Sequence, residues 1–314
     1  MRFFRHYAGF VLLLAPLPLA PLARADVTVR YHTDIKAAAI IPAGALAGMQ
    51  DLILRIKGNK GYSSQGNVTS IMDVMTQDLL LVDVAHKRFA SIPAGQYAQQ
   101  LKIAAPAIPE QARAALASMK TNLESRNTGR TAAIQGIQAD EHEFVLTVDM
   151  PLPDGTPMPS PFVKMVMQVW TAKPEETQRV AALQEIKVYS ASASSGSNPL
   201  ELIQQILSGL PGMGDNLGAM MDEMIKNGGM SLRVHLEVSS PVLALMSQQL
   251  PGQALPAGLD PNAPLMQMTQ EVVELSTGSL EDALFEVPAD YQQTSVEEVL
   301  KGAVSAAPPP QFKQ

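Results

Sequence analysis

The chain of 314 residues contains no cysteine and only one tryptophan, Trp170. Without cysteine the protein can form no disulfide bond, carry out no thiol catalysis and accept no lipid on a cysteine at a cleavage site. Exported proteins of this size in a eukaryotic secretory pathway usually carry disulfides, so their absence favours a bacterial envelope. After residue 25 no run of 18 consecutive apolar residues occurs, and we expect no transmembrane segment in the mature protein.

Positive charge is also scarce. The formal net charge is −7, and removal of the N-terminal segment with Arg2, Arg5 and Arg24 makes it more negative. A surface of this sign repels phosphate backbones and anionic lipid headgroups. We therefore expect no nucleic-acid partner.

The N-terminus has the three-part layout of a secretory signal peptide. Arg2 and Arg5 are followed by an apolar run from Ala8 to Leu22, which ends in the small-x-small triplet Ala23-Arg24-Ala25. The run is shorter than the roughly 20 residues of a spanning helix, and it contains three prolines. This pattern predicts cleavage after Ala25 and a periplasmic or secreted mature protein.

Most of the mature chain alternates apolar and polar residues with period two, which predicts half-buried strands. In the segment 26–35, for example, Val27, Val29 and Tyr31 share one face. Connections of a few residues between such segments are typical of antiparallel pairing. Further predicted strands cover 52–56, 71–75, 79–84, 88–92, 131–137, 143–148, 163–171, 230–238 and 265–275, with a last edge segment at 285–288.

Helical spacing replaces this alternation in three places. Pro109-Glu110 opens an apolar stripe that continues through Met119 and Leu123, and Pro174 opens a helix that reaches about Tyr189. Cap signals and apolar stripes then predict a helical insertion at about 190–229. The last twelve residues, 303–314, include three consecutive prolines and are predicted to form a disordered tail.

These elements predict an α+β fold, with a large curved antiparallel sheet (a half-barrel) and helices that cover its concave face. The predicted organisation has a signal peptide at 1–25 and a single half-barrel domain at 26–302. The helical insertion at 190–229 lies within that domain, and the proline-rich tail at 303–314 follows it.

Short motifs near the two ends of the mature chain point to a family. They are Lys57-Gly58-Asn59-Lys60, Ile71-Met72-Asp73, Leu81-Val82-Asp83 and Phe285-Glu286-Val287-Pro288 with Tyr291. The sequence resembles the strand core of uncharacterised bacterial envelope proteins, which are similar in architecture to the lipoprotein-carrier (LolA-like) half-barrels of the periplasm. The resemblance covers roughly residues 26–93 and 265–291, with Ala289-Asp290 departing from the usual ending. It implies a curved sheet, a helical lid and a hydrophobic cleft, but no catalytic residue.

No residue pattern names a reaction. The chain lacks the H-E-x-x-H, P-loop, Rossmann and G-x-S-x-G motifs. Glu141-His142-Glu143 is interpreted as a surface turn, and His235 with Glu237 as the solvent-facing side of a strand. We therefore expect a protein that is not an enzyme and that needs no metal or cofactor.

Methionine is concentrated between Met213 and Met230, and this cluster leaves three interpretations open. Thioethers suit Cu(I), although no histidine or cysteine assists here. They also form adaptable apolar surfaces for a lipid or a partner, and they fill ordinary cores. Trp170, at the end of a predicted strand, either anchors the following helix or stacks on a ligand.

The resulting hypothesis is a periplasmic or secreted, non-enzymatic carrier of an apolar ligand, either a lipid or a lipoprotein acyl chain. The alternative is a structural or interaction protein of the envelope without a small ligand, which contacts a protein partner through its helical insertion or its tail. The candidate ligand-binding residues are Trp170, Leu217, Met220, Met221 and Met224.

Overall fold

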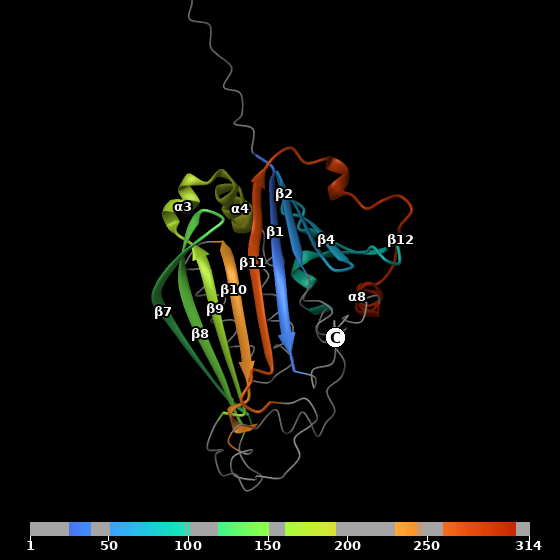
Figure 1. The fold of residues 1–314 in the computed structure, drawn as a ribbon. Coiled ribbons are helices and arrows are strands. Elements are labelled where there is room, and N and C mark those ends of the chain that lie inside the picture. Colours follow the sequence, from blue (N-terminus) through green and yellow to red (C-terminus); the bar gives the residue numbers. More distant parts are fainter. Residues whose placement is uncertain are drawn as a thin grey trace, which may run out of the picture.

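The computed structural model describes residues 25–38, 51–97, 99–100, 119–150, 161–192, 230–243, 245 and 260–305. Its dominant feature is one 12-stranded sheet (Figure 1). The strand order is β12-β6-β5-β4-β3-β2-β1-β11-β10-β9-β8-β7. The strands are β1 (Val27–Ala37), β2 (Leu52–Lys57), β3 (Lys60–Gln65), β4 (Val68–Asp73), β5 (Asp78–Asp83), β6 (Arg88–Pro93), β7 (Lys120–Ile134), β8 (Ile137–Asp149), β9 (Val163–Ala172), β10 (Ser231–Ser239), β11 (Met266–Thr277) and β12 (Gln292–Gln293).

Tight turns generate the meander, as the short spacing predicts. Between β7 and β8, Gln135 and Gly136 both have positive φ, which matches the right-handed twist of a two-residue hairpin. Gly58 and Gly66 have positive φ in the turns that follow β2 and β3. Neighbouring strands are therefore antiparallel throughout, except that β12 pairs in parallel with β6.

Two distant parts of the chain meet at the centre of the sheet. β1 pairs with β11, so that Val29 lies opposite Leu275 and Ile35 opposite Met268. A bulge between Arg30 and Tyr31 interrupts the register. This pairing joins the meander β1–β6 to the strands β7–β11.

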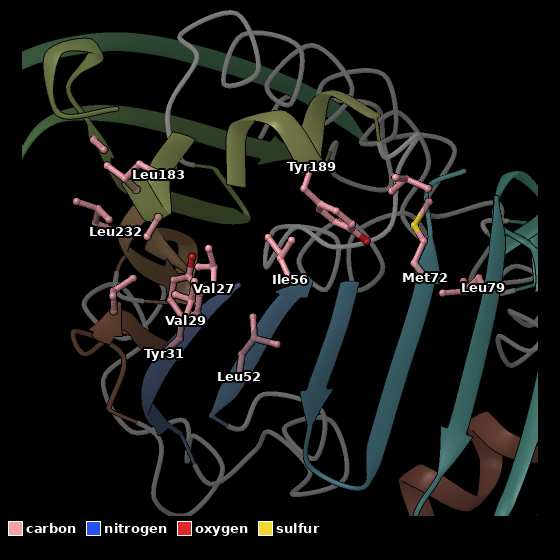
Figure 2. Packing of buried hydrophobic residues seen from close by; sticks show 14 of the residues in the cluster. Val27, Val29, Tyr31, Leu52, Ile56, Met72, Leu79, Leu183, Tyr189 and Leu232 are labelled. Atoms are coloured by element: carbon pink, nitrogen blue, oxygen red, sulfur yellow. The ribbon is translucent and has the colours of Figure 1, made fainter. Parts of the chain in front are cut away.

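The described helices are short and pack on limited parts of the sheet. α3 (Pro174–Arg179) and α4 (Ala181–Ser192) follow β9, and α4 packs mainly on β1, β2 and β11. α8 (Val296–Ser305) packs on β5 and β6. Figure 2 shows Tyr189 of α4 directed at the strand that carries Ile56, and Leu183 of α4 belongs to the same buried cluster.

The C-terminal segment passes from one face of the sheet to the other. Phe285, at the end of the short 3-10 helix η3 (Asp282–Phe285), packs edge-on against Tyr62 of β3, with the ring centroids 6.5 Å apart. The chain then adds β12 to the edge of the sheet. α8 follows and buries Val299 among residues of the opposite face, such as Leu81. The segments η3, β12 and α8 thus contact both faces and the β6 edge of this part of the sheet.

The prediction of an α+β fold with helices over the concave face is wrong. The sheet dominates the structure, and the described helices are few and short. The predicted helix that opens at Pro109 lies outside the described residues as far as residue 118, and its last part is wrong because β7 begins at Lys120 and includes Leu123. Similarly, Phe285 lies in a 3-10 helix, and the edge strand is β12.

Within the described ranges, no helix is long and apolar enough to cross a membrane. The predicted signal peptide and nearly all of the predicted insertion at 190–229 lie outside those ranges. α8 extends to Ser305, and residues 306–314 of the predicted tail also lie outside.

Candidate functional site

The two faces of the sheet differ in chemistry. We call the face that carries Val29, Leu236 and Phe144 the inner face; the register places all three on the same side. We call the opposite face, with Arg30 and Glu141, the outer face. The inner face is apolar across nearly every strand, and most outer-face positions of β7–β11 are polar or charged.

Four methionines lie on the inner face in two matching pairs. Met165 and Met167 are on β9, and Met266 and Met268 are on β11, with β10 between them. Val238 separates Met165 from Met266 in one row, and Leu236 separates Met167 from Met268 in the next. Because side chains two residues apart on a strand share a face, each Met-x-Met pair presents both thioethers to the same side.

These methionines belong to one apolar cluster, which we call the Met-rich face. Its buried members are Phe144, Leu146, Val148, Met167, Val169, Val234, Leu236 and Met268, and its half-buried members include Ile35, Met119, Leu123, Met165 and Met266. Methionine is unbranched and polarizable, so it repacks around different shapes more readily than leucine or valine does. The Met-rich face can therefore adapt to an apolar molecule.

The described helices pack mainly elsewhere. Their principal contacts with the sheet fall on β1, β2, β5, β6 and β11 rather than on β7 to β10. Gln270 of β11 donates a hydrogen bond to Thr33 of β1 at 3.1 Å. This polar pair separates the Met-rich face from the second apolar cluster, which includes Leu183 of α4 and Val29. The Met-rich face is thus a separate apolar surface on the same side of the sheet.

The outer face behind it holds a network of ion pairs. Glu141 is fully buried and accepts hydrogen bonds from Arg130 at 2.5 Å and from Thr128 at 2.9 Å. Glu143 accepts from Arg126 at 2.8 Å, and the hydrogen bond from Gln168, together with Arg126, holds the pKa of its carboxyl below the ordinary value. Every one of these carboxylates has partners, which indicates a stabilising role.

The interpretation of Glu141-His142-Glu143 as a surface turn is therefore wrong. All three residues lie within β8, and the two glutamates share the outer face because they are two positions apart. Paired arginines on β7 allow a polar triplet to occupy the interior of a strand, and the local sequence does not reveal that pairing.

Trp170 also lies on the outer face, opposite in register to Glu141 and Arg233. The Arg233 guanidinium lies over the indole at 5.8 Å and donates to Glu271 at 2.6 Å. Trp170 packs against the core cluster beside α4 and is not part of the Met-rich face. The other four candidate residues, Leu217, Met220, Met221 and Met224, lie outside the described residues.

A second charged group caps the turn between β5 and β6. Asp83 is fully buried and accepts hydrogen bonds from the His86 ring at 2.8 Å and from Arg88 at 3.1 Å. Burial alone would raise the pKa of Asp83, but these hydrogen bonds outweigh burial and lower it. No cluster of three or more potential metal-ligating His, Asp or Glu side chains occurs within the described part of the chain.

Comparisons with known proteins leave the chain without a family. No protein-family model matches it, and no curated protein matches it. Among solved structures, one similar chain is described as "Structure of PNGF-II in C2 space group", with 8% identity and a TM-score of 0.34. That alignment covers 90% of this chain, which spans about a third (33%) of the other protein's length.

The Met-rich face was not predicted, because the highest density of methionine along the chain falls at 213–230 instead. The signal was present as two short motifs, Met165-Val166-Met167 and Met266-Gln267-Met268, each inside a predicted strand. Their position on one face, with a single strand between them, depends on the order of β9, β10 and β11, which one sequence does not specify.

Proposed function

We propose that the protein is a non-enzymatic binding protein of the bacterial envelope that carries an apolar ligand, such as a lipid or a lipoprotein acyl chain, on the Met-rich face. The observation that supports the proposal most is the pair of Met-x-Met motifs on β9 and β11, which share one apolar face. Burial of each ligand CH₂ there contributes about 0.8 kcal/mol. Secretion through the predicted signal peptide and the resemblance to LolA-like proteins agree with this proposal.

The half-buried methionines Met165 and Met266 provide the test. In the double variant Met165→Gln/Met266→Gln, two amides replace thioethers of similar length, and a buried amide without partners costs roughly 1–3 kcal/mol. We expect binding of methyl laurate, measured by equilibrium dialysis, to weaken at least tenfold. The matched control Met165→Leu/Met266→Leu keeps apolar volume and is expected to bind within about twofold of the wild type.

Native mass spectrometry of the purified protein gives an independent readout, in which a co-purifying lipid is expected. The proposal fails if the wild type binds neither methyl laurate nor dodecane, or if the glutamine variant binds as tightly as the leucine variant. Either result would favour the alternative, a structural or interaction protein of the envelope.

A further inference from the structure

On β3 and β4, two polar side chains interrupt the apolar inner face. In the row that runs Val29, Leu54, Ser63, Ser70, Leu81 and Ala90, the two serines stand among aliphatic residues. Their hydroxyls are 2.7 Å apart, so one donates to the other and one hydroxyl hydrogen is left for another acceptor. The neighbouring inner-face residue on β3 is Gly61, so this part of β3 presents only small side chains to the inner face.

Tyr189 of α4 points its phenol at this place. Its side chain is buried, with 5% of the residue exposed, and its hydroxyl has no hydrogen-bond partner among the residues that the structure describes. A Cβ at Gly61 would overlap the phenol oxygen, which locates that oxygen directly above the β3 backbone. Figure 2 shows the ring reaching down from α4 between Ile56 and Met72. A buried, unpaired hydroxyl is costly unless something completes its hydrogen bonds.

The inner-face residues around the serine pair are less buried than those beneath the two helices. Ile56 beneath α4 and Leu81 beside α8 are buried, whereas Leu54, Ser63 and Ser70 between them are half-buried. The serine pair therefore lies in a strip that neither helix fully covers. Ser63 is two residues from Gly61 on the same face, so it is about 7 Å along the strand from the residue under the phenol.

The charges nearby favour an uncharged ligand group. Burial, and then the negative charge of Asp73, raise the pKa of Tyr189 to about 12, so the phenol is a neutral donor at physiological pH. A carboxylate placed here would meet the same negative charge and lose its hydration. An ester or amide carbonyl accepts hydrogen bonds without that cost.

We propose that Tyr189, Ser63 and Ser70 form a hydroxyl cluster that hydrogen-bonds the uncharged carbonyl of an acyl ester or amide held on the inner face. The inference rests on the proposed function, because it assigns the polar end of the same class of ligand. The half-buried side chain of Leu54, next to the serines, would contact the start of the acyl chain.

The test compares three probes by equilibrium dialysis: methyl laurate, laurate at pH 8 and dodecane. We expect the wild type to bind methyl laurate more tightly than either of the others. Tyr189→Phe keeps the ring and removes the hydroxyl, and should weaken methyl laurate binding about 3- to 10-fold while leaving dodecane binding unchanged. Ser63→Ala should act in the same direction, and Ser64→Ala, on the outer face of the same strand, should have no effect.

Thermal unfolding of the unliganded variants separates binding from folding. Tyr189→Phe should unfold at the wild-type temperature or above it, because it removes an unpaired buried group. Two results overturn the hydroxyl cluster: wild-type affinity of Tyr189→Phe for methyl laurate, or tighter binding of laurate than of methyl laurate. Absence of binding by any probe overturns the proposed function as well, whereas dodecane binding without ester preference overturns this inference alone.

Discussion

The two parts of the sheet that meet at the β1–β11 pair are stabilised in different ways. In β1–β6, Tyr189, Leu183 and Val299 from α4 and α8 pack on the inner face on either side of the half-buried serine pair, while Phe285 covers part of the outer face. In β7–β11 the strands are longer, arginines neutralise buried carboxylates on the outer face, and methionines line the inner face. Side chains from the helices determine the packing of most of the inner face in β1–β6, whereas the methionine-lined region retains an adaptability that favours binding of an apolar molecule.

The strongest test of this contrast concerns the ion pairs. Arg130 is 56% exposed and pairs with fully buried Glu141, whereas Arg30 is 55% exposed and pairs with Glu274, which is 43% exposed. Arg130→Ala leaves a buried carboxylate without its cation, and we expect a loss of about 2 to 3 kcal/mol in unfolding free energy, allowing for the exposure of Arg130.

Arg30→Ala is the matched control, because its partner carboxylate remains hydrated, and its expected loss is below about 1 kcal/mol. Urea denaturation of both variants measures the difference. Equal losses in the two variants would mean that the buried ion pair of β7–β8 stabilises the protein no more than an exposed ion pair does.

The second test concerns the close packing in β1–β6. Gly61→Ala places a methyl group where the Tyr189 hydroxyl lies, and we expect a loss of about 2 kcal/mol through overpacking. Gly95→Ala introduces the same methyl group into open space and should change stability by less than about 1 kcal/mol. If Gly61→Ala were as mild as Gly95→Ala in urea denaturation, α4 could not be tightly packed on β3.

The sequence predicted most of the strands because their period-two alternation is strong, as in β1, where Val27, Val29 and Tyr31 are all buried. It failed on the first part of β7, residues 120–130, where Leu123 continued an apparent helical stripe through Met119 and the other residues are largely exposed and polar. At the edge of a sheet only one side of a strand has a neighbour, so the burial pattern is weak there.

The candidate site was harder to predict than the strands. The Met-rich face requires the order β9-β10-β11, and the hydroxyl cluster brings Ser63 to Tyr189, which lies more than a hundred positions along the chain. Period two locates each side chain on a face of its strand, but it carries no information about which strands become neighbours. The long-range β1–β11 pairing is likewise absent from any local pattern.

The smallest effect is expected when the buried carboxylates of the two parts, Asp83 and Glu143, are replaced by amides. The pKa of each is lowered in the folded protein, so each ionised group contributes stability above its unfolded pKa of about 4, and that stability is lost as the pH falls through the lowered folded pKa. Asp83→Asn removes charge-assisted hydrogen bonds from His86 and Arg88, and we expect a loss of about 1 kcal/mol at pH 7.

Because protonated Asp83 in the wild type also lacks these charge-assisted bonds, the difference between wild type and Asp83→Asn should shrink as the pH falls from 5 to 2. Glu143→Gln, measured alongside by urea denaturation at each pH, should show the same convergence through its bonds to Gln168 and Arg126. A difference for Asp83→Asn that is independent of pH would mean that the turn depends on the shape of the side chain rather than its charge. The contrast between the two parts would then lie in charge itself, with ionisation contributing only in β7–β11.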